Sequence, residues 1–138
     1  MTFKYKCFYS LIFLLVFYSC SSKDDSFFNE NALIISHDGY EREYLLHVPE
    51  NYDSSISHPI VFNFHGFGGT ATDHMYSADF RSISDTAGFI LVYPQGLALD
   101  DGSPHWNIAE NGGDNKSDSD DFGSVSYTHL TLPTIAIV

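Results

Sequence analysis

The fold class is decided by the stretch Pro59-Ile60-Val61-Phe62-Asn63-Phe64-His65-Gly66-Phe67-Gly68-Gly69. Its first half is a nearly continuous apolar run, which is typical of a strand buried on both faces of a parallel sheet. Its second half is rich in glycine, which lets a backbone turn sharply and approach a ligand closely. The stretch therefore predicts a central strand that ends in a tight turn.

Before this stretch, the sequence predicts an antiparallel hairpin. Residues 32–36 and 43–49 read as two strands, and Asp38-Gly39 between them is a hairpin-turn signal. Residues 49–58 are rich in Ser, Asn and Pro and read as a loop.

After the stretch, the sequence predicts a helix and another buried strand. Residues 77–87 read as one helix, and residues 89–93 as the strand. The expected buried face of the helix consists of Phe80, Ile83, Ser84 and Ala87. Gly88 is the expected C-cap. A hairpin followed by strand, helix and strand predicts an α/β fold with a right-handed parallel crossover.

The glycine-rich turn carries the candidate chemistry. α/β-hydrolases build one side of the oxyanion hole at such a turn, after a buried strand, because the developing oxyanion needs unobstructed backbone N–H groups. We expect Gly66, Phe67 and Gly68 to form this loop and His65 to orient it by hydrogen bonding, not to act as a catalytic base. The alternative is a glycine-rich strand-to-helix turn that binds nothing.

Three further motifs follow in order, namely 87–96 (AGFILVYPQG), Trp106-Asn107 and 120–123 (DDFG). Together with the HGFGG turn, they resemble the polyhydroxybutyrate depolymerase and feruloyl esterase-like family of α/β-hydrolases. The resemblance covers about 43–123. At Trp106 it suggests substrate binding, although this side chain could equally pack under the loop.

The resemblance implies a carboxylic-ester hydrolase that works through a Ser–His–Asp triad and an acyl-enzyme, without a cofactor. The implied substrates are polyhydroxyalkanoate oligomers, or feruloyl and acetyl esters on plant polysaccharide. The implied serine lies in a GxSxG elbow downstream of the DDFG motif, and this sequence contains no GxSxG. We therefore expect an incomplete, N-terminal part of an α/β-hydrolase fold that is inactive by itself.

Two alternatives to this function stay open. One is a non-catalytic cell-surface binding module on the same scaffold. The other, within enzymes, is a prolyl-oligopeptidase-like hydrolase or a dienelactone hydrolase, against which the YPQG and WN motifs argue.

The N-terminus has the pattern of an export signal. Lys4 and Lys6 precede a short apolar run, and Ser19-Cys20 is followed by polar residues. We expect a signal peptide over 1–19, a lipid on Cys20 and a tether over 20–31, which makes the protein a cell-surface lipoprotein. The alternative is ordinary cleavage near Ser19 and release of the protein. Any membrane association would come through this anchor.

The last fifteen residues, 124–138, resemble the translation of a sequencing-library adapter. The ten residues 125–134 are encoded in order by one frame of a transposon adapter, and the residue pattern predicts neither helix nor strand continuing into them. Residues of such an origin do not belong to the native protein. We therefore expect the native partial esterase domain to span 32–123.

Charge and histidine spacing exclude other classes of protein. The formal net charge is -12, with only 6 Lys and Arg, so no basic patch is available to bind nucleic acid. The histidines lack metal-ligand spacing, and we expect no zinc site. The acidic stretch 114–121 could offer oxygens to Ca²⁺, but it lacks the EF-hand glycine and terminal glutamate. We expect a solvated loop there, in which Asp120 or Asp121 caps the next helix.

Overall fold

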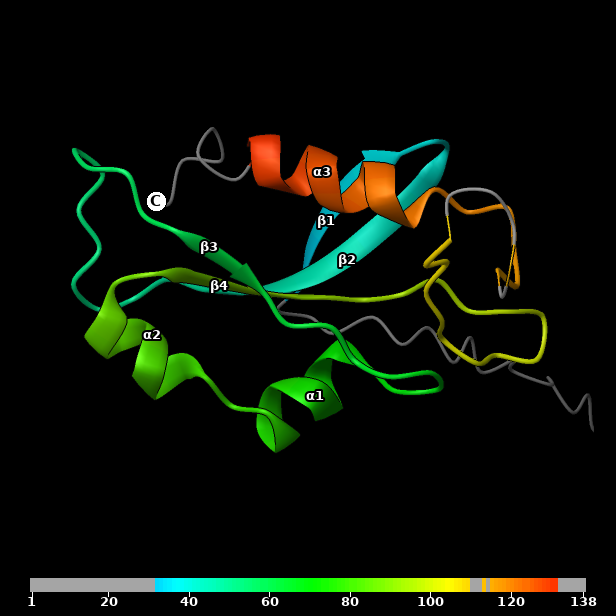
Figure 1. Ribbon diagram of the computed structural model, residues 1–138, viewed down its shortest axis with the longest axis horizontal. Helices are drawn as coiled ribbons and strands as arrows, with labels where there is room; N and C mark the ends of the chain where they lie inside the picture. The colour runs from blue at the N-terminus through cyan, green and yellow to red at the C-terminus, as the bar shows by residue number, and fades with distance from the viewer. Residues whose placement is uncertain (1–31, 110–112, 114, 132–138) are drawn as a thin grey trace, which may run out of the picture.

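The computed structural model of the chain describes residues 32–109, 113 and 115–131 (Figure 1). The expected signal peptide, the lipidation site Cys20 and the tether therefore lie outside the described residues. Among the described helices, none is both long and apolar enough to cross a bilayer.

The described strands form one mixed sheet. They are β1 (Leu33–His37), β2 (Tyr40–His47), β3 (Ile60–Phe62) and β4 (Ile90–Pro94), in the spatial order β1-β2-β4-β3. β1 pairs antiparallel with β2, β2 antiparallel with β4, and β3 parallel with β4. The predicted hairpin and the predicted parallel pair are both confirmed, and β1 and β3 form the two edges of this sheet.

The hairpin turn has the backbone that its sequence predicts. Asp38 and Gly39 have φ angles of 50° and 80°, so both central residues lie in the left-handed region. Tight turns of this kind match the twist of the flanking strands and favour Asp-Gly. The local sequence therefore sets the register in which Leu33 pairs with Tyr44.

Both faces of the sheet are covered, which explains why β4 is buried along its whole length. One apolar cluster contains Ile35, Tyr44, Ile90 and Val92, and the other contains Leu45, Ala71, Leu91 and Tyr93. Successive strand residues alternate between the two clusters, as the pleat requires. A mixed α/β layer architecture results, with β2 and β4 at its centre.

Of the predicted helix over residues 77–87, the structure shows only residues 81–87 as a helix, and a separate helix that was not predicted ends at Ser77. Helix α1 (Ala71–Ser77) begins after Thr70, whose hydroxyl accepts from the Asp73 N–H at 3.0 Å. Helix α2 (Arg81–Ala87) begins only after Asp79, whose carboxylate accepts from the Arg81 backbone and side chain. This local pairing starts a new helix and separates it from α1.

The predicted buried face of that helix is wrong. Phe80 and Ile83 are 42% and 56% exposed, and of the four predicted residues only Ser84 is buried. The Ser84 hydroxyl donates to the Phe89 carbonyl, which ties α2 to the segment entering β4. The predicted C-cap is confirmed, since Gly88 has a φ of 74° and donates to the Ser84 carbonyl.

A third helix, α3 (Asp121–Thr131), lies on the opposite side of the sheet from α1 and α2 (Figure 1). The Asp120 carboxylate accepts from the Gly123 N–H at 2.8 Å, so Asp120 caps this helix as predicted. The expectation that no helix continues past residue 124 is wrong. The apolar and small residues after the cap continue the helical turn and bury Ser124 and Thr128. The origin of residues 124–138 remains a prediction, because it rests on the codon match.

Candidate functional site

The candidate site lies where the two parallel strands end. β3 leads into the loop 65–69, and β4 leads into Gln95-Gly96. Because β3 and β4 are neighbours and run in the same direction, their carboxyl ends bring these two segments together. Crevices at this end of a parallel sheet are the usual ligand sites of α/β folds.

His65 connects the two segments, and its hydrogen bonds determine its protonation. The Gly96 N–H donates to its Nε2 at 3.0 Å. Nε2 therefore carries no proton, and Nδ1–H donates to the Gly66 carbonyl at 2.7 Å. Burial lowers the pKa of His65 below its ordinary value of 6.5, since only 3% of the residue is exposed. The His65 ring is thus neutral, and each of its nitrogens has a hydrogen-bond partner.

The loop presents two adjacent N–H groups. The indole N–H of Trp106 donates to the His65 carbonyl at 3.0 Å, and the Gly66 carbonyl accepts from the Gly69 N–H as well as from His65. In a trans peptide the N–H points away from the carbonyl of the same unit. The N–H groups on these two peptides belong to Gly66 and Phe67, and within the described part of the chain neither has a hydrogen-bond partner.

Gly68 contributes to the site in a different way. Its N–H donates to the Pro104 carbonyl at 2.8 Å, so this N–H is not available to a ligand. Its φ of 73° lies in the left-handed region, which a residue with a side chain adopts only at a cost. Of the three predicted loop residues, Gly66 and Phe67 therefore offer donors, whereas Gly68 shapes the turn.

Trp106 lies beneath the loop and beside a groove. Its ring meets Phe64 edge-on, with centroids 5.1 Å apart at 88°. It also lines a largely apolar groove of about 480 Å³. The groove is lined by Phe64, Trp106, Asn107, Ile108, Asp121, Phe122, Val125 and Ser126. Packing under the loop and exposure to the groove thus coexist in this one side chain.

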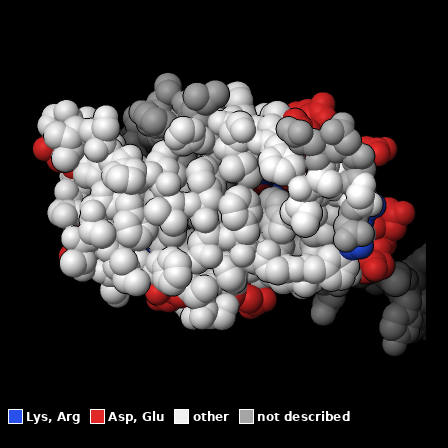
Figure 2. Space-filling model, viewed as in Figure 1, with Lys and Arg blue, Asp and Glu red and all other residues white. Residues whose placement is uncertain are grey.

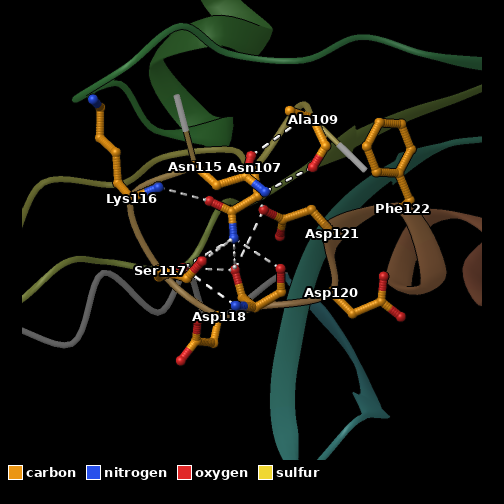
Figure 3. A pocket seen from close by; sticks show the side chains of 10 residues that line it. Asn107, Ala109, Asn115, Lys116, Ser117, Asp118, Asp120, Asp121 and Phe122 are labelled. Carbon is orange, nitrogen blue, oxygen red and sulfur yellow. Dashed lines mark hydrogen bonds between the residues drawn. The ribbon is translucent and has the colours of Figure 1, made fainter. Parts of the chain in front are cut away.

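The acidic stretch after Trp106 is organised around Asn107. The Asn107 amide donates to the carbonyls of Ser117 and Ser119 at 2.9 and 2.8 Å, and its oxygen accepts from the Lys116 N–H at 3.1 Å. Figure 3 shows these bonds converging on Asn107 in a hollow of about 830 Å³. The described part of this stretch is a loop, as expected, with Lys116, Asp118 and Asp120 exposed to solvent. The buried Asn107 side chain holds this loop in place.

Acidic side chains are among those that line the hollow. Among the residues that the structure describes, no three His, Cys, Asp or Glu side chains gather closely enough to share an ion. In Figure 3 the Asp118 and Asp120 side chains point away from Asn107. Asp120 instead accepts from His37 at 3.0 Å, and this bond lowers the pKa of its carboxyl.

Charged side chains are unevenly distributed over the surface of the chain. Figure 2 shows the acidic side chains gathered along the rim of the face in view, with uncharged residues across its centre. At the loop itself, the Lys116 ammonium lies 5.8 Å from the centroid of the Phe67 ring. This distance is within the range of a cation–π contact between the two side chains.

Three residues that contribute to the site were not predicted to do so. Gly96 anchors His65, and a side chain there would collide with the His105 carbonyl oxygen. Pro104 holds the Gly68 amide, and Arg42 lies over the Trp106 ring. Gly96 belongs to the YPQG motif, so the sequence marked this position, but it did not show that the Gly96 N–H bonds His65.

Comparisons of the chain with protein-family models and with curated proteins found no match.

Proposed function

We propose that this chain provides the oxyanion-binding part of a serine carboxylic-ester hydrolase of the polyhydroxybutyrate depolymerase and feruloyl esterase type. One observation carries the proposal. The neighbouring Gly66 and Phe67 N–H groups are free and exposed at the carboxyl end of a parallel strand, and donors hold the carbonyls of the same peptides. Donors fixed in advance stabilise a developing negative charge without reorganising.

The proposed reaction uses the loop in two steps. A serine attacks the ester carbonyl, a histidine takes its proton, and the carbonyl oxygen becomes an oxyanion that the Gly66 and Phe67 amides stabilise. The alcohol then leaves, and water hydrolyses the acyl-enzyme in the same way. Each lost oxyanion donor typically lowers kcat about 10²–10³-fold. In this proposal the serine, the base histidine and its aspartate would follow Gly123 in the native gene.

His65 is unsuited to the role of base in this proposal. Its Nε2 accepts the Gly96 N–H and its Nδ1 is engaged with the Gly66 carbonyl. Burial lowers its pKa as well. The residue is therefore assigned to orienting the loop, as its place in the HGFGG motif suggested.

The fold supports the finer assignment to the α/β-hydrolases. A hairpin that leads into a parallel pair, with helices on both sides of the sheet, is the beginning expected of that fold. The apolar side chains of Phe64, Trp106 and Phe122, which line one groove, suit the acyl or aromatic part of an ester. Val125 and Ser126 of the same groove belong to the segment predicted to derive from the adapter and are left out of this assignment. By the same resemblance, the proposed substrates are polyhydroxyalkanoate oligomers, or feruloyl and acetyl esters, and the proposed location is the cell surface.

Extending the gene past the Gly123 codon tests the proposal. We expect a GxSxG elbow within a few dozen codons, and an extended protein that hydrolyses p-nitrophenyl acetate. Replacing the elbow serine by alanine should abolish turnover, whereas Ser82→Ala on the exposed side of α2 should not. The 138-residue chain should show no serine-dependent turnover. An extended gene without an elbow would instead support a non-catalytic binding module.

A further inference from the structure

We propose that Trp106 is a positioning residue of the oxyanion loop, and that Arg42 and Asp121 hold it in place. This inference rests on the proposed function and deepens it. The indole N–H bonds the His65 carbonyl, and this carbonyl shares a rigid peptide unit with the free Gly66 N–H. The orientation of the indole thereby sets the direction in which the Gly66 amide points.

Arg42 holds one face of the indole. Its guanidinium carbon lies 5.9 Å from the centroid of the Trp106 ring, within the range of a cation–π contact. Arg42 is 4% exposed and forms an ion pair with Asp121, which is 5% exposed. Desolvation strengthens a cation–π contact, so the buried Arg42 side chain stabilises the orientation of the Trp106 ring.

Asp121 also holds the backbone next to the indole. One of its carboxylate oxygens accepts from Arg42, and the other accepts from the Asn107 N–H at 2.6 Å. Asn107 follows Trp106 directly, so a single buried carboxylate fixes both the ring and the main chain that carries it. Phe64 completes the arrangement from the edge of the ring.

The chain offers a clean test, because Trp106 is its single tryptophan. Replacing it with benzothienylalanine substitutes sulfur for the indole N–H and keeps the ring, and Trp106→Phe also removes the donor. The orientation of the Gly66 N–H would be measured in the 138-residue chain from residual dipolar couplings. We expect it to change in both variants. In Tyr76→Phe, which removes one polar hydrogen from an exposed ring, we expect no change.

A second readout separates this inference from the proposed function. Acetate, as a simple carboxylate probe, should shift the Gly66 and Phe67 amide signals of the unmodified chain. Loss of the indole N–H should weaken acetate binding by up to about tenfold, because the Gly66 N–H would no longer point at acetate. A tenfold change is the size expected for the loss of one hydrogen bond. Arg42→Lys should weaken it less, because the indole N–H remains.

The outcomes are distinct. An unchanged Gly66 orientation in the folded benzothienylalanine variant overturns the positioning role, whatever acetate does. A changed orientation with no response to acetate in the unmodified chain supports the positioning role and counts against the oxyanion function. Signals from the β4 amides of Leu91 and Val92 report whether each variant is folded, since both residues are fully buried.

Discussion

The Gly96 N–H donates to Nε2 of His65 across 31 positions of sequence, and this bond fixes the tautomer of a buried imidazole. The bond joins the end of β4 to the start of the loop 65–69. It also makes protonation of His65 unfavourable, because a proton on Nε2 would face the N–H that now donates to it.

Acid should therefore destabilise the protein through His65. Burial lowers the folded-state pKa of His65 below 6.5, so the unfolded chain binds the proton more readily. The free energy of unfolding should be insensitive to this group above pH 6.5 and should fall as the pH drops towards the folded-state value. Urea unfolding at pH 7 and pH 5 measures the loss, and His65→Gln should reduce it. An imidazole that titrates at 6.5 or above in the folded protein would contradict this expectation.

Gly96 and Gly66 should respond differently to the same substitution. In Gly96→Ala the new methyl group would meet the His105 carbonyl oxygen, which is backbone and cannot move aside easily. We expect a loss of about 1–3 kcal/mol or more in the free energy of unfolding. In Gly66→Ala nothing lies within 4 Å of the new methyl group, and the change should stay within about 0.5 kcal/mol. Thermal unfolding of the two variants side by side checks the contrast, and equal stabilities would refute it.

The buried pair Arg42–Asp121 should be costly to break from one side. Arg42→Met leaves the Asp121 carboxylate buried without its cation, and such a loss typically costs about 3–5 kcal/mol. Adding Asp121→Asn removes the uncompensated charge and should recover part of the loss. Urea unfolding of both single variants and the double variant gives the coupling. Additive effects of the two substitutions would mean that the pair does not act as a unit.

Lipidation should depend on Cys20 and not on Cys7, the other cysteine of the chain. In a bacterial host, we expect metabolic labelling with palmitate to mark the wild-type protein and Cys7→Ser. Cys20→Ser should remain unlabelled, because the proposed lipid forms a thioether with this residue. Labelling of Cys20→Ser, or no labelling of the wild type, would favour ordinary cleavage near Ser19 and a released protein.

The strands were the predictable part of the fold, because their signals are local. The apolar run before His65 and the Asp-Gly turn each carry enough information in a few residues. The break between α1 and α2 was missed, since it depends on the contact of Asp79 with Arg81 and not on hydrophobic periodicity. The strand order, with β2 beside β4, depends on pairings between distant segments that no local pattern encodes.

The site was predicted in part for the same reason. The HGFGG motif located the loop, because glycines directly after a buried apolar run indicate a tight turn at the end of a strand. The sequence could not reveal that the Gly68 amide bonds Pro104, or that Arg42 covers Trp106, since these residues are brought together only by folding. The role of Trp106 was left open between groove and support, and the structure shows contacts of both kinds.

Strand β3 has a paired neighbour on one side only within the described sheet. The backbone groups on its other side can template the strand of a second molecule, which is how unprotected sheet edges seed aggregates. Val61 and Phe62 are only partly buried, so apolar contacts can add to this backbone pairing between molecules. Any preparation of the chain should therefore associate increasingly as its concentration rises, and dilution should favour the monomer.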